Sequence, residues 1–104
     1  NVINNGAIKN LPDDCCVEIP CDIDKSGISS QKIGNLPLQL AALISTNVNV
    51  QQLTVEAALN HRKEHVYHAA MVDPHTASEL SINQIYQMVD ELIEAHGAMI
   101  PKLI

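Results

Sequence analysis

The chain has 104 residues, of which 46% are hydrophobic, and this is enough for one globular domain with a modest core. Its formal net charge is −6, with six Lys and Arg against twelve Asp and Glu, so it lacks the basic surface needed to bind nucleic acid or an anionic membrane. No stretch reaches the ~20 apolar residues of a membrane-spanning helix, and the N-terminal segment has neither the basic nor the apolar region of a signal peptide.

The first third of the chain has the pattern of extended structure. Residues 17–24 alternate between apolar and polar side chains, which predicts a β-strand with one packed face and one solvated face. The apolar members are Val17, Ile19, Cys21 and Ile23. Asp24 to Gly27 forms a turn, so residues 28–33 can return as the second strand of a hairpin. Pro20 has no N–H to donate, which places the first strand at a sheet edge or a bulge.

After Gly34 the spacing of apolar residues changes to that of a helix. Asn35 is a suitable cap, and Pro37 fits the first turn because its missing N–H costs nothing there. The helical pattern extends to about Ala58. Residues 48–50 have weaker helix propensity, so the helix could break or kink at that point.

Two further helices follow, joined by a short one. A helical run over about residues 62–72 must end at Asp73, because the next residue is Pro74, and Asp73 then caps a short helix. Ser81 to Gln84 has the sequence of a capping box, followed by a helical apolar stripe. Gly97 lies where a left-handed helix cap belongs.

These elements predict an α+β fold in one domain, residues 1–104. A short antiparallel hairpin region comes first and three or four packed helices follow.

The histidines are the clearest chemical cluster that the residues alone suggest. His61, His65 and His68 have the i, i+4, i+7 spacing of one helix face, and His75 follows. Three imidazoles on one face could hold a transition metal, but a polar, His-rich helix surface has the same pattern. The Glu that a zincin motif has directly after its first His is absent, because Arg62 stands there.

The cysteines and carboxylates give weaker indications. Three Cys with no C-x-x-C pair form a poor disulfide framework and are typical of reduced thiols in a cytoplasmic protein. A buried free Cys commonly acts as a small hydrophobe. The acidic residues of the first third suggest paired carboxylates or a calcium site, but they also match the solvated face of a strand. They are Asp13, Asp14, Glu18, Asp22 and Asp24.

Several longer segments resemble glycoside hydrolase family 4, and within it the α-galactosidase (melibiase) branch. Residues 4–12, NNGAIKNLP, followed by VEIP at 17–20, resemble the N-x-G-x-I-x-N-L-P…V-E-x-P signature of that family. The segments GNLP at 34–37 and VYHAAMVDPHTA at 66–77 agree with the same branch. The resemblance covers essentially the whole chain and indicates the C-terminal region of a longer enzyme.

The resemblance implies an NAD- and Mn²⁺-dependent hydrolysis of α-galactosides such as melibiose, by oxidation, elimination, addition and reduction. It also implies a cytoplasmic homo-oligomer in which this region works with an upstream NAD-binding Rossmann domain. The family's nucleotide loop, metal ligands and catalytic Tyr all lie upstream of the matched region. We therefore expect no catalytic or metal-binding residue in this chain, no cofactor bound to it and no activity from it alone.

What the resemblance does carry over is the signature turn, which in this family lies near the substrate cleft. Asn4, Asn5, Gly6 and Asn10 are accordingly the candidate substrate-binding residues that shape this cleft. The expected ligand is an α-galactoside, and neither nucleic acid nor a membrane is expected as a partner.

Three other functions remain open from the sequence. The helices could form a non-catalytic interaction module that uses its apolar stripes against a partner. The parent could act on an α-glucuronide, an α-galacturonide or a phosphoglucoside, since these sister activities share parts of the pattern. His61, His65 and His68 could make the chain a small metal-binding protein.

Overall fold

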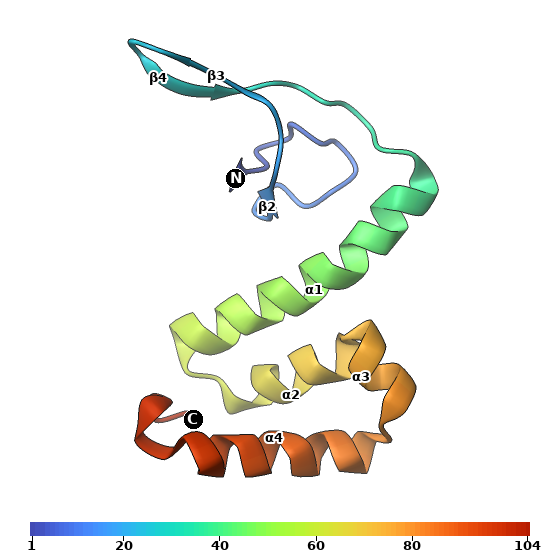
Figure 1. The fold of residues 1–104 in the computed structure, drawn as a ribbon, viewed down its shortest axis with the longest axis vertical. Coiled ribbons are helices and arrows are strands. Elements are labelled where there is room, and N and C mark those ends of the chain that lie inside the picture. The colour runs from blue at the N-terminus through green and yellow to red at the C-terminus, as the bar shows by residue number, and fades with distance from the viewer. The chain divides into compact units, whose positions relative to one another are not determined.

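The computed structural model describes all 104 residues and confirms the α+β class, with two small antiparallel sheets followed by four α-helices (Figure 1). The chain divides into two compact units, residues 1–45 and residues 46–104. Each unit is described by itself. None of the helices is both long and apolar enough to cross a membrane.

The first unit is built around a small sheet and the loop that joins its strands. Strand β1 (Val2–Ile3) pairs antiparallel with β2 (Cys16–Val17), so Val2 lies opposite Val17. Between the strands the chain folds back as an ordered loop, whose apolar side chains form the core of this unit. The buried apolar residues are Ala7, Ile8, Leu11, Cys15, Val17 and Ala41.

Strands β3 (Cys21–Asp24) and β4 (Gly27–Ser30) form the predicted hairpin, with Ile23 opposite Ile28. The prediction of one continuous strand over 17–24 is wrong, since β2 ends at Val17 and β3 begins only after Pro20, which cannot donate a ladder hydrogen bond. Of the predicted packed face, Val17 is buried and Ile19 and Cys21 are half-buried, but the prediction is wrong for Ile23. Ile23 is 78% exposed and Ile28 is 68% exposed, because no other element of the unit covers the hairpin.

Helix α1 (Leu38–Asn60) begins directly after Pro37, whose carbonyl accepts hydrogen bonds from the N–H groups of Leu40 and Ala41. The predicted cap at Asn35 is wrong, because Asn35 lies three residues before the first residue of the helix. It runs for 23 residues without a break, so the weak helix propensity of residues 48–50 does not interrupt it. Tertiary packing of Val48, which is 4% exposed, outweighs a propensity difference of a few tenths of a kcal/mol.

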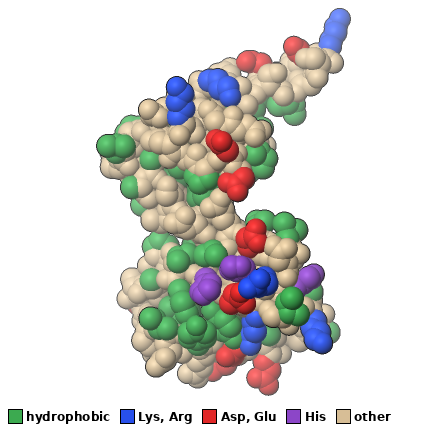
Figure 2. All heavy atoms as spheres, turned by 180° about the vertical axis from the view of Figure 1, so that it is seen from behind, with side chains coloured by type: hydrophobic (Ala, Val, Ile, Leu, Met, Phe, Trp, Pro, Cys, Tyr) green, Lys and Arg blue, Asp and Glu red, His purple; other side chains and the backbone are tan.

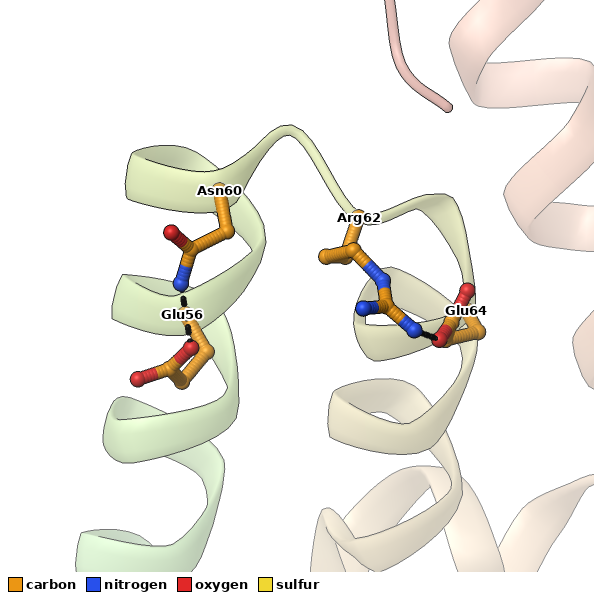
Figure 3. Close-up of polar contacts among 4 residues, drawn as sticks. All are labelled: Glu56, Asn60, Arg62 and Glu64. Atoms are coloured by element: carbon orange, nitrogen blue, oxygen red, sulfur yellow. Dashed lines mark hydrogen bonds and ion pairs between the residues drawn. The ribbon is translucent and has the colours of Figure 1, made fainter.

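The corner between α1 and α2 (Lys63–Val72) has two local polar pairs (Figure 3). Asn60 donates to Glu56 within the last turn of α1, and Arg62 forms an ion pair with Glu64 at the start of α2. His61 lies between them with a φ of 55°, a left-handed conformation that a continuous helix cannot contain. The chain therefore turns at this residue and starts a new helix.

The remaining helices end and begin where the sequence predicts. Asp73 accepts a hydrogen bond from the N–H of Thr76 and caps α3 (Pro74–Glu79), with Pro74 at the first position. Ser81 and Gln84 form the complete capping box of α4 (Ile82–His96). A short 3-10 helix, η1 (Gly97–Met99), follows α4.

The core of the second unit depends on the inner face of α4. Ile85 and Val89 are 2% and 4% exposed, whereas Ile82 and Leu92, which share the apolar pattern of the helix, are 64% and 49% exposed. The chain end returns to the α1–α2 corner, where Ile104 donates to the carbonyl of His61 and accepts from the N–H of Lys63.

A polar contact joins α2 to α4 on the outside of this unit. Lys63 Nζ lies 2.9 Å from Asp90 Oδ1, and the Tyr67 hydroxyl donates to the same oxygen. The Tyr67 ring lies 4.6 Å from that of Tyr86, centroid to centroid. The hydrogen bonds from Tyr67 and then Lys63 hold the pKa of Asp90 below its ordinary value.

We expect this contact to make the free energy of unfolding depend on pH in the acid range. Because the pKa of Asp90 is lower in the folded than in the unfolded chain, its stabilisation is complete above the unfolded value and is lost as the pH falls through the folded value. Urea unfolding followed between about pH 6 and pH 2 should show a falling midpoint, and Asp90→Asn and Tyr67→Phe should both flatten that dependence. An Asp90→Asn protein with the wild-type pH dependence would contradict this role.

Candidate functional site

The signature turn of residues 4–12 is organised by the buried side chain of Asn4, which is 0% exposed. Its Nδ2 donates to the carbonyls of Ile8, Leu11 and Pro12 at 2.9, 3.2 and 2.9 Å. Its Oδ1 accepts from the N–H of Ile8 at 2.7 Å. The side-chain amide therefore provides hydrogen-bond partners for backbone groups that have no partner in a regular helix or sheet.

Asn5 and Gly6 follow in left-handed conformations, with φ values of 43° and 71°. Asn and Gly tolerate this region better than other residues do, which explains the turn that the sequence predicts here. The N–H of Asn5 donates to the carbonyl of Asp13, and its carbonyl accepts from Lys32 Nζ at 3.3 Å. The side chain of Asn5 is exposed, so the turn presents this amide to solvent.

The loop is also tied to the segment that leads into α1. Ile8 forms an isolated bridge with Gly34, and the N–H groups of Ile33 and Gly34 both donate to the carbonyl of Ala7. Asn10 makes a two-way contact with Leu36, donating to its carbonyl and accepting from its N–H, both at 2.9 Å. These contacts hold residues 4–12 and 33–36 together.

Of the four candidate substrate-binding residues, two have their side-chain amides occupied inside the fold. Asn4 and Asn10 hold the loop, Gly6 permits its turn and Asn5 alone offers an exposed side chain. The structure thus brings all four into one loop, and contact between this loop and a substrate stays a prediction. Sequence reasoning missed the contact of Lys32 with the turn, since no local pattern links residues 27 positions apart.

The histidines that could form a metal cluster do not lie on one helix face. His61 lies in the corner before α2 and not on that helix, so the three residues do not share a helix face. The rings of His65 and His68 lie 5.9 Å apart and edge to face. No group of three or more His, Cys, Asp or Glu in the chain is arranged to hold a metal ion, so these residues do not fit a Mn²⁺ centre.

The cysteines are free thiols in three different environments. Cys15 is buried, and this burial, followed by the charge of Asp14, raises the pKa of its thiol. Cys16 is exposed on β2, and Cys21 is half-buried with its Sγ 3.5 Å from the carbonyl oxygen of Ile19. Cys15, and not Cys21 of the predicted strand face, is therefore the thiol that packs as a small core side chain.

The second unit contains an apolar pocket of about 260 Å³. It lies between the last turns of α1, the first turn of α2, the end of α4 and the C-terminal tail. Hydrophobic side chains gather on this helical unit in Figure 2. The lining residues are Thr54, Ala57, Ala58, Val66, Ile93, Ile100, Pro101 and Leu103. No ionisable side chain lines it, so it offers packing surface and no acid–base chemistry.

Comparison with known proteins identifies the family. Residues 1–76 match the model of the family 4 glycosyl hydrolase C-terminal domain. The chain belongs to this family. The matched range contains the whole signature turn and both small sheets, and it ends within α3. The resemblance of the signature segments to family 4 is therefore confirmed.

Curated relatives agree with that assignment. The chain is 50% identical over 102 residues to an alpha-galactosidase of Bacillus subtilis, covering 98% of this chain and 24% of the relative. It is 35% identical to an alpha-galactosidase of Rhizobium meliloti, covering 98% and 21%. It is also 33% identical to a probable 6-phospho-beta-glucosidase of B. subtilis, covering 98% and 22%. The chain thus spans about a quarter of the length of these relatives.

Solved structures of the family have the same fold. A 6-phospho-alpha-glucosidase from gut microorganisms, in complex with NAD and glucose-6-phosphate, matches with a TM-score of 0.87 and 34% identity over 99% of this chain and 23% of that one. A second 6-phospho-alpha-glucosidase, in complex with NAD and Mn²⁺, matches with a TM-score of 0.88 at 27% identity, over 99% and 23%. This domain therefore has the fold of the C-terminal quarter of family 4 enzymes.

Proposed function

We propose that this chain is the C-terminal domain of a cytoplasmic α-galactosidase that uses NAD and Mn²⁺ and hydrolyses α-galactosides such as melibiose. The observation that supports this substrate most directly is the 50% identity to the B. subtilis alpha-galactosidase over nearly the whole chain. The NAD and Mn²⁺ named for the solved 6-phospho-alpha-glucosidases support the cofactors.

Under this proposal the NAD and Mn²⁺ sites lie in the part of the full-length enzyme outside these 104 residues. The chain has no metal-binding cluster and no Gly-rich phosphate loop. Under this proposal the 104 residues supply the signature loop, whose exposed Asn5 amide faces the substrate while Asn4 and Asn10 hold its shape. An upstream Rossmann domain and a second subunit would complete the enzyme.

A 6-phospho-α- or 6-phospho-β-glucoside is the second candidate substrate. The 33% identity to a probable 6-phospho-beta-glucosidase and the 34% identity to the solved 6-phospho-alpha-glucosidase favour it over other sugars. It is second because both identities are well below that to the alpha-galactosidase.

Hydrolysis of p-nitrophenyl glycosides by the full-length enzyme tests the proposal. With NAD, Mn²⁺ and a reductant we expect release of p-nitrophenol from the α-galactoside, with no release when NAD or Mn²⁺ is omitted. This chain alone should give none under the same conditions. Hydrolysis of only the 6-phosphoglucosides would transfer the proposal to the second substrate, and activity that persists without NAD would contradict it.

A further inference from the structure

Lys32 lies beside the turn that carries the exposed amide of Asn5. Its Nζ donates to the backbone carbonyl of Asn5 at 3.3 Å, although the two residues are 27 positions apart in the chain. Both residues are exposed. The ammonium group of Lys32 and the side-chain amide of Asn5 are therefore presented to solvent at the same turn.

The backbone on both sides of Lys32 is held by hydrogen bonds. The N–H of Gln31 donates to the carbonyl of Pro20 at 3.0 Å, and the N–H of Ile33 donates to that of Ala7 at 2.8 Å. A ligand that binds Lys32 therefore orders a side chain and not a backbone segment. The loss of conformational entropy on binding is smaller for that reason.

The contact with Asn5 leaves Lys32 able to bind a ligand. An ammonium group has three N–H donors and no acceptor, and the Asn5 carbonyl accepts from one of them. The other two donors can serve a ligand, because the residue is exposed. The contact also keeps the end of a long, flexible side chain close to the turn before any ligand arrives.

Asp13 adds a carboxylate to the same turn. Its backbone carbonyl accepts from the N–H of Asn5 at 2.9 Å, and its Oδ1 lies 3.7 Å from the position of a Cβ placed on Gly6. Lys32 can only donate, the Asp13 carboxylate can only accept, and the Asn5 amide does both. Because sugar hydroxyls also donate and accept, this combination suits a neutral sugar, whereas the charge of Asp13 would repel a phosphate.

We propose that Lys32 is a substrate-binding residue, whose ammonium donates a hydrogen bond to a hydroxyl oxygen of a neutral galactoside beside the Asn5 amide. This inference rests on the proposed function, in which the signature turn faces the substrate. It adds to the site a residue from outside the signature segment of residues 4–12. A few such polar groups fix the orientation of a ligand in its site.

Hydrolysis of p-nitrophenyl α-galactoside by the full-length enzyme with Lys32→Met tests this role, because Met removes the donors and keeps an unbranched side chain. We expect KM to rise about 10-fold and kcat to change by less than about twofold, since a contact made equally in the ground and transition states changes KM alone. The Kd for galactose, measured by isothermal titration calorimetry, should rise by the same factor. Lys25→Met in the exposed hairpin turn is the matched control for the loss of one positive charge, and it should change neither constant.

Asn5→Gly separates a failure of this inference from a failure of the proposed function. Gly adopts the positive φ of 43° readily and keeps the carbonyl to which Lys32 donates, so only the amide is lost. A higher KM for Asn5→Gly with an unchanged KM for Lys32→Met would overturn the role of Lys32 alone. Unchanged values for both variants would show that the turn lies away from the substrate.

Two other results would also overturn the inference. A loss confined to 6-phosphoglucosides would mean that Lys32 pairs with the phosphate and not with a hydroxyl. A higher KM together with a lower urea midpoint for unfolding would mean that Lys32 only supports the fold. If the wild-type enzyme does not hydrolyse the α-galactoside, the proposed function fails by itself, and the Kd for the unphosphorylated product sugar still tests Lys32.

Discussion

Replacing Asn4 by alanine should lower the free energy of unfolding by about 3–5 kcal/mol, one of the two largest effects expected in this domain. The change removes four hydrogen bonds at once and leaves the carbonyls of Ile8, Leu11 and Pro12 without the donor that Nδ2 provides. Because Asn4 is 0% exposed, water cannot replace the lost amide without opening the loop.

Urea unfolding followed by circular dichroism measures this effect. Asn49→Ala on the exposed side of α1 is the matched control, and it should change stability by no more than about 0.5 kcal/mol. Asn4→Asp should also destabilise the loop, because the new carboxylate keeps the acceptor for Ile8 and loses every donor. A loss below about 1 kcal/mol for Asn4→Ala would show that the loop does not depend on this side chain.

Ile85→Ala should destabilise the helical unit by about 2–5 kcal/mol. Ile85 is 2% exposed and lies on the same buried face of α4 as Val89. Truncating its side chain removes the favourable free energy of burying it and leaves a cavity. The control is Ile82→Ala in the same helix, because Ile82 is 64% exposed. Ile82→Ala should change stability by less than about 1 kcal/mol.

Urea unfolding of the two variants under the same conditions makes this comparison. The slope of the free energy of unfolding against urea concentration should be the same for both, which checks that their unfolded states are alike. Equal losses for Ile82 and Ile85 would contradict the burial of the α4 inner face. A large loss at Ile82 in the full-length enzyme, absent in this chain, would instead indicate that the rest of the enzyme covers the start of α4.

Local sequence signals were sufficient for the N-terminal ends of α3 and α4. Asp73 with Pro74, and Ser81 with Gln84, satisfy helix N-termini with groups two or three residues away, so their geometry depends on little else. Where prediction depended on distant contacts it was less accurate. The predictions that failed are the uniform strand over 17–24, the packed position of Ile23, the cap at Asn35 and the helix face shared by His61, His65 and His68.

In the candidate site, too, some features follow from the residue types and others do not. The left-handed turn at Asn5 and Gly6 follows from the residue types, because few others adopt a positive φ at low cost. The division of roles among the asparagines does not follow from residue type. Asn4 and Asn5 are adjacent and identical, yet one is buried with four hydrogen bonds and the other exposes its amide to solvent.

The sequence by itself determined the fold class, the hairpin, the N-terminal caps of α3 and α4 and the family, because each is carried by neighbouring residues or by long matched segments. Only the tertiary structure decided which apolar residues are core. Ile85 and Ile82, or Val17 and Ile23, are equivalent in pattern, and they differ because one of each pair meets another element of the chain. Burial is a property of what packs against a residue, and that partner is set by the fold and not by local sequence.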